Sequence, residues 1–89
     1  MTRMTLLPTT PEFQRMMLYK IARTLAGLTV RDLSVEAGVS TNTLTRLESG
    51  EELKPATVRK IRAALEAHGV EFVPHPTWAE WVQPRAKDG

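Results

Sequence analysis

The sequence contains no cysteine and no long run of apolar residues. The absence of cysteine excludes disulfide bonds and cysteine-ligated metal sites, so a reducing cytoplasm is the expected compartment. No stretch approaches the roughly 20 apolar residues that a membrane-spanning helix needs, so no membrane contact is expected. The first ten residues, MTRMTLLPTT, lack the apolar core and the small-residue cleavage site of a secretion signal. These absences together favour a cytoplasmic protein.

Residues that carry enzyme or metal chemistry are also scarce. The two histidines, His68 and His75, do not form the His-x-x-x-His spacing that places two ligands on one helix face. No glycine-rich phosphate loop and no nucleophile motif is present. His68 instead continues the apolar spacing of the helix predicted to contain it. We therefore expect no enzyme activity, no metal site and no cofactor.

The charge is nearly balanced, with 12 basic and 10 acidic residues and a net charge of +2. Such a balance permits nucleic-acid binding without arguing for it. The distribution is uneven, because residues 1–35 carry five basic and two acidic groups. Arg59, Lys60 and Arg62 form a second basic cluster, which we interpret as a solvated helix face.

The first helix is predicted to begin at Pro11, where Thr10 supplies a hydroxyl N-cap and Glu12 an acid in the first turn. Apolar residues then recur every four positions until Gly27 ends the helix. This stripe consists of Phe13, Met17, Ile21 and Leu25, with Met16, Leu18 and Ala22 beside it. Residues 1–10 are expected to form a flexible tail.

Further elements are marked by their ends. A second, short helix follows the N-cap Thr29 and stops at Gly38. A fourth helix begins at Pro55, with apolar residues at the three- and four-residue spacing of an amphipathic helix. Alternation in residues 70–73 predicts a short strand, and residues 77–82 are expected to form one or two more helical turns.

The stretch between these helices, residues 40–49, is ambiguous. Its β-branched residues fall on alternate positions, as in a half-buried strand, yet Ser40 can cap a helix. At about 100° per residue, a helix gathers Leu44 and Leu47 on one face, whereas a strand here would lack a neighbouring partner. We therefore predict a helix. Its exposed arc consists of Thr41, Asn42, Thr45 and Arg46.

Two short helices joined by a glycine-containing turn form the layout of a helix-turn-helix. The segment LTVRDLSVEAGVSTNTLTRLESG resembles the DNA-binding domain of phage repressors, Cro and the xenobiotic-response-element (XRE) type of bacterial regulators. The residues that match the family pattern are Leu28, Leu33, Ala37, Gly38, Val39, Ser40, Leu44, Leu47, Glu48 and Gly50. The resemblance implies an all-α, lambda-repressor-like bundle of four or five helices with a short extended C-terminal segment. It places a DNA-binding domain at residues 11–69, the motif at 29–49 and the recognition helix at 40–49.

The resemblance also assigns roles to side chains. The four residues of the exposed arc would read bases, because arginine can contact guanine with two bonds, asparagine can pair with adenine, and threonine methyls can touch thymine. The ordinary alternative for such residues is a solvated helix face. Phosphate contacts are expected from Thr29, Arg31, Ser40, Thr43 and Lys54. Arg23 would pair with Glu48 and fasten the first helix to the recognition helix.

Some residues depart from the family pattern. Val30 stands where a phosphate-binding glutamine is usual, which removes that contact. Ser34 replaces the usual alanine, and its hydroxyl is expected to bond back along its own helix. Glu51 and Glu52 occupy a loop where many relatives are basic, so they would weaken a DNA-backbone contact and leave Lys54 as the best candidate there.

The C-terminal extension, residues 70–89, holds all three aromatic side chains outside the first helix. These residues could cover the chain's own core or form a twofold interface, since tryptophan is a common interface anchor. We favour an interface, because proteins of this fold usually bind palindromic operators as dimers. The candidate dimerisation residues are Phe72, Trp78, Trp81 and Val82.

The sequence therefore predicts a homodimeric repressor that binds a specific site in double-stranded DNA. The alternative is a protein-binding module, such as an antitoxin or adaptor, that uses the same fold to grip a protein partner through its C-terminal aromatic residues. Strong salt dependence and sequence preference in DNA binding would favour the regulator.

Overall fold

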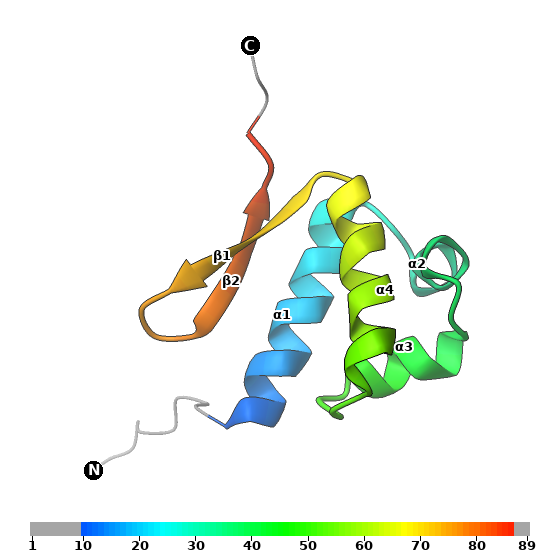
Figure 1. Ribbon diagram of the computed structural model, residues 1–89, viewed down its shortest axis with the longest axis horizontal. Coiled ribbons are helices and arrows are strands. Elements are labelled where there is room, and N and C mark those ends of the chain that lie inside the picture. Colours follow the sequence, from blue (N-terminus) through cyan, green and yellow to red (C-terminus); the bar gives the residue numbers. More distant parts are fainter. Residues whose placement is uncertain (1–9, 87–89) are drawn as a thin grey trace.

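Four helices and a C-terminal β-hairpin make up the computed structural model, which describes residues 10–86 (Figure 1). The elements are α1 (Pro11–Ala26), α2 (Val30–Ala37), α3 (Thr41–Leu47), α4 (Pro55–Ala67), β1 (Val70–His75) and β2 (Ala79–Pro84). The hairpin packs beside α1, and α3 lies near the N-terminal end of α4, at the other side of the molecule (Figure 1). The flexible tail predicted for residues 1–10 lies outside the described residues, apart from Thr10.

The first two helices begin where their capping residues predict. The Thr10 hydroxyl accepts a hydrogen bond from the Phe13 N–H at 3.2 Å. The Thr29 hydroxyl accepts from the Asp32 N–H at 3.0 Å, and the Asp32 carboxylate accepts from the Thr29 N–H at 3.1 Å. These bonds from Thr29 lower the pKa of Asp32 below its usual value, because they favour the charged carboxylate. Both helix starts are therefore encoded locally.

The turn between α2 and α3 has the conformation that its glycine predicts. Gly38 has φ of +71°, in the left-handed region, and its N–H donates to backbone carbonyls of the last turn of α2. The Ser34 hydroxyl donates to the Arg31 carbonyl at 2.7 Å, so this buried group is satisfied within its own helix, as expected.

The core lies where the four helices meet and the hairpin covers them. Its fully buried side chains are Leu33, Leu44, Leu47, Ile61, Leu65 and Val70. From α1, the buried residues are Leu18, Tyr19 and Ala22. The buried face is therefore centred beside the predicted stripe and not on it. A strict four-residue repeat drifts by about 40° per step around a helix. Consequently Leu25, at the far end of the stripe, is 41% exposed.

The predicted bundle of helices is confirmed with four members, but the fold is not purely all-α, because a two-stranded antiparallel sheet follows α4. The strand expected at residues 70–73 is present, but residues 77–82 form a loop and most of β2 instead of helical turns. The register pairs Phe72 with Val82 and Val73 with Trp81. Pairing with β1 satisfies the backbone of β2 while Val82 enters the core, which two isolated helical turns could not achieve.

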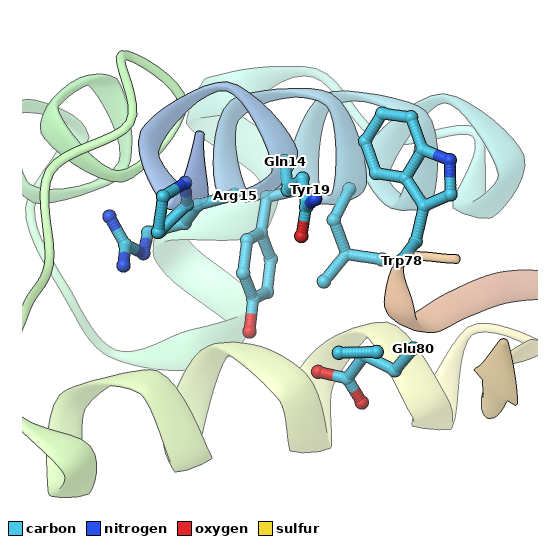
Figure 2. Close-up of a pocket in the computed structure, with 8 residues that line it drawn as sticks. Gln14, Arg15, Tyr19, Trp78 and Glu80 are labelled. Atoms are coloured by element: carbon cyan, nitrogen blue, oxygen red, sulfur yellow. The ribbon is translucent and has the colours of Figure 1, made fainter. Parts of the chain in front are cut away.

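One arginine of the second basic cluster, Arg62, joins the hairpin to α4. The interpretation of this arginine as part of a solvated face is therefore wrong. Arg62 donates to both carboxylate oxygens of Glu80, at 2.7 and 2.9 Å, and its guanidinium lies 3.9 Å from the centre of the Phe72 ring. It also donates to the Tyr19 hydroxyl at 3.3 Å. The bonds to Glu80 raise the pKa of Arg62, and burial raises the pKa of Tyr19. Figure 2 shows Tyr19 of α1 and Glu80 of the hairpin among the side chains that line a pocket between these two elements.

The expected packing role of His68 is also wrong. This residue follows α4 as its C-cap, its side chain is exposed, and Nε2 lies 3.3 Å from Glu36 Oε1 on α2. The apolar stripe of α4 therefore ends at Leu65, because the helix stops before another turn can return a side chain to the core.

Candidate nucleic-acid interface

The third helix presents one buried and one exposed face. Leu44 and Leu47 are 0% and 1% exposed, and they anchor α3 to the rest of the core. The four predicted base-reading residues are all exposed: Thr41, Asn42, Thr45 and Arg46. The helix thus offers short hydrogen-bonding side chains and one long guanidinium to a partner, on a rigid support.

The N-terminal end of α3 is ordered by two hydroxyls. Ser40 Oγ accepts from the Thr43 N–H at 3.0 Å, and the two side-chain oxygens lie 2.9 Å apart. The cap fixes the first turn, whose remaining backbone N–H groups suit an anion such as a phosphate. Thr43 is half-buried, whereas Ser40 is exposed.

The predicted phosphate contacts are divided between a hollow beside α3 and the start of α2. Thr43, Arg46 and Lys54 line one hollow beside α3, together with Glu52, Leu53 and Thr57. Lys54 is the exposed N-cap of α4 and makes no side-chain capping bond. Thr29 and Arg31 instead belong to the start of α2, where Thr29 already takes part in the capping box.

An ion pair beneath the surface joins α1 to the end of α3. Arg23 donates from Nε and Nη2 to the two carboxylate oxygens of Glu48, at 2.7 and 3.1 Å. Its Nη1 donates to the Leu28 carbonyl at 3.1 Å. Side-chain exposure is 22% for Arg23 and 7% for Glu48, and the bonds to Glu48 raise the pKa of Arg23. The structure therefore places this pair where the resemblance implies it.

One residue beside the exposed arc was missed from the sequence. Glu51 was interpreted only as an unfavourable charge, but its Oε1 accepts from Arg46 Nε at 2.8 Å, and Arg46 Nη2 also lies 2.8 Å from that oxygen. The two residues are five apart across a helix end, so helical spacing alone does not bring them together. The glycine at position 50, which has φ of +99°, is a sequence signal for a chain reversal after the helix.

Residues 10–86 contain no group of three histidine, aspartate or glutamate side chains arranged to hold a metal ion. None of the helices in that range has both the length and the apolar character required to cross a membrane.

Comparison with known families agrees with the geometry. A family model described as helix-turn-helix matches residues 20–72, which is more than half of the chain. The match runs from the second half of α1 through α2, α3 and α4 into β1. Among curated proteins, no sequence matches the chain.

Proposed function

Because this chain belongs to the Cro/C1-type (XRE) helix-turn-helix family, whose members are DNA-binding regulators, we propose that it recognises a specific duplex site through α3 and regulates transcription. The observation that carries this proposal is the exposed arc of α3, which is polar, rigidly supported and flanked by Lys54. It lies on the helix that the motif would place in the major groove.

The dimensions and chemistry of α3 suit that groove. An α-helix with its side chains is about 10–12 Å in diameter, and the major groove of B-DNA is about 12 Å wide. In this proposal Arg46 reads a guanine, Asn42 an adenine, and the methyls of Thr41 and Thr45 touch thymine. Ser40 and Lys54, with Thr43, Thr29 and Arg31 as further candidates, position the protein on phosphates.

Replacing Arg46 by alanine is expected to cost about 1–3 kcal/mol at one operator position and to relax the preference there. Selection from randomised duplexes at a stated salt concentration would identify that position. Arg85→Ala is the matched control, because it removes an exposed guanidinium that directly follows β2 and does not belong to α3. A variant at Arg46 whose preference is unchanged at every position would contradict the assignment.

We further propose that the protein acts in the cytoplasm as a homodimeric repressor that blocks a promoter. Trp78 and Trp81 support the dimer: their ring centres are 5.0 Å apart, Trp78 lies 6.4 Å from the Phe13 ring, and all three side chains stay partly exposed. Val82 is only 3% exposed within the chain's own core, and Phe72 packs against Tyr19 and beneath Arg62, so these two predicted interface residues have intramolecular roles.

The dimer can be tested by replacing Trp78 and Trp81 together with alanine. We expect the dissociation constant of the dimer to rise at least about ten-fold in sedimentation equilibrium, because central tryptophans dominate many interfaces. Val35→Ala is the control, since Val35 is 74% exposed on α2 and its loss should not affect association. A double variant as dimeric as the parent would exclude these tryptophans from the dimer interface.

Tight co-purification with a protein partner, together with weak DNA binding, would favour an antitoxin or adaptor.

A further inference from the structure

The ion pair between Arg46 and Glu51 lies directly beside the surface proposed to read DNA. Both side chains are about half exposed, at 48% and 52%. An exposed pair of this kind adds little to stability, because water screens it. The main consequence of the pair is therefore the position that it gives to the Arg46 guanidinium.

The backbone holds the two residues together. The Glu51 N–H donates to the Arg46 carbonyl at 3.0 Å, and the Ser49 N–H donates to the same carbonyl at 3.1 Å. The chain thus reverses at the end of α3 so that residue 51 returns to residue 46. Because both backbones are already fixed, only side-chain entropy is lost when the carboxylate and the guanidinium meet.

The loop that carries Glu51 is anchored to α1. Arg15 Nη1 donates to the Gly50 carbonyl. Gly50 also lies so close to α1 that a Cβ atom there would be 2.7 Å from the backbone oxygen of Glu12. Glu51 therefore extends from a supported part of the chain, next to a helix that is itself held by the core.

The contact leaves the reading edge of Arg46 free. A guanidinium has five N–H donors, and Glu51 Oε1 faces Nε and one side of Nη2. The outer edge, formed by Nη1 and the remaining N–H of Nη2, still offers two parallel donors. This is the pair that matches O6 and N7 of a guanine in the major groove.

We propose that Glu51 is a specificity-determining residue, which orients Arg46 so that its outer edge meets a guanine. The inference rests on the proposed function of α3. When DNA binds this surface and displaces water, the attraction between the Glu51 carboxylate and the Arg46 guanidinium strengthens. The orientation of Arg46 is therefore held most firmly in the bound state. The carboxylate also offsets the positive charge that would otherwise draw Arg46 towards any phosphate, which favours the base contact.

The neighbouring acid provides a matched control. Glu52 lines the hollow beside α3, yet no ion pair or hydrogen bond of its side chain is present among the described residues. Glu51→Ala and Glu52→Ala remove the same charge from adjacent positions of the same loop. Both changes should therefore strengthen non-specific DNA binding, since both remove repulsion from phosphates, and only Glu51→Ala also releases Arg46.

The test uses two duplexes at one fixed salt concentration. The first is the selected duplex, and the second differs from it at the base pair that Arg46→Ala ceases to distinguish. Discrimination is the ratio of the affinities for the two duplexes. We expect Glu51→Ala to lower the discrimination about three- to ten-fold, Glu51→Gln to lower it less, and Glu52→Ala to change it less than about two-fold. In the Arg46→Ala background, Glu51→Ala should have no further effect on discrimination. Circular dichroism should show all variants folded, because both acids are exposed.

Two outcomes would overturn the proposal while leaving the role of α3 intact. In the first outcome, Glu51→Ala discriminates between the two duplexes as well as Glu52→Ala does, whereas Arg46→Ala loses this discrimination. Arg46 would then read its base without help from Glu51. Sharper discrimination in Glu51→Ala would mean that the carboxylate competes with the base. Absence of any sequence preference in the parent protein would instead remove the proposed function, and this inference with it.

Discussion

Replacing Arg23 by alanine is expected to lower the free energy of unfolding by about 3–5 kcal/mol. The change leaves the carboxylate of Glu48 only 7% exposed and without its charged partner, so its desolvation is no longer offset. It also removes a donor from the Leu28 carbonyl at the turn after α1. Thermal or denaturant unfolding would measure the loss, which corresponds to a fall in Tm of at least roughly 10 °C for a domain of this size.

Two further variants show whether the effect belongs to the pair. Arg59→Ala removes an exposed arginine from α4 and should change the stability by less than about 0.5 kcal/mol. Combining Arg23→Met with Glu48→Leu removes both charges, and it should recover much of the stability lost in Arg23→Ala. An unchanged Tm in Arg23→Ala would show that the pair does not secure α3 to α1.

Replacing Gly50 by alanine is expected to destabilise the protein by about 3 kcal/mol. The residue has φ of +99°, which disfavours any side chain, and the added Cβ would lie 2.7 Å from the Glu12 oxygen. Because that oxygen belongs to the backbone of α1, relief requires the loop or the helix to move. Unfolding by denaturant, with m checked for a constant two-state transition, would measure the cost.

Gly38 is the natural control for this substitution. It also has positive φ, +71°, but a Cβ there would meet nothing within 4 Å. Gly38→Ala should therefore show the conformational cost alone, about 1–2 kcal/mol. If the two variants were equally destabilised, the close approach of Gly50 to α1 would have no energetic consequence.

The helix starts could be predicted because their signals are local. Thr10 and Thr29 each accept a hydrogen bond from an N–H three residues later. The residues next to each threonine in the sequence are therefore sufficient to predict the helix start. The hairpin could not be predicted in the same way. Whether residues 77–82 form a helix or a strand depends on β1, on the contact of Val82 with the core and on Arg62 from α4. These are contacts between separate segments, and no spacing in the sequence reports them.

The candidate site shows the same division. The exposed arc of α3 follows from the helical period once Leu44 and Leu47 are assigned to the core. The contact between Arg46 and Glu51 depends on how the chain reverses after the helix, which the composition of the loop does not specify. The sequence therefore predicted which residues face outward, but not how the longest of them is held.

The register of the hairpin limits how another chain can join it. Pro74 lies opposite Glu80, and Pro84 lies opposite Val70, so each strand contains one position without an N–H donor. A third strand added to either edge would meet an interrupted row of hydrogen-bonding groups, which discourages extension of the sheet and uncontrolled aggregation. In the proposed dimer, a second copy of the chain would therefore pack against Trp78 and Trp81 and would not lengthen the ladder of the hairpin.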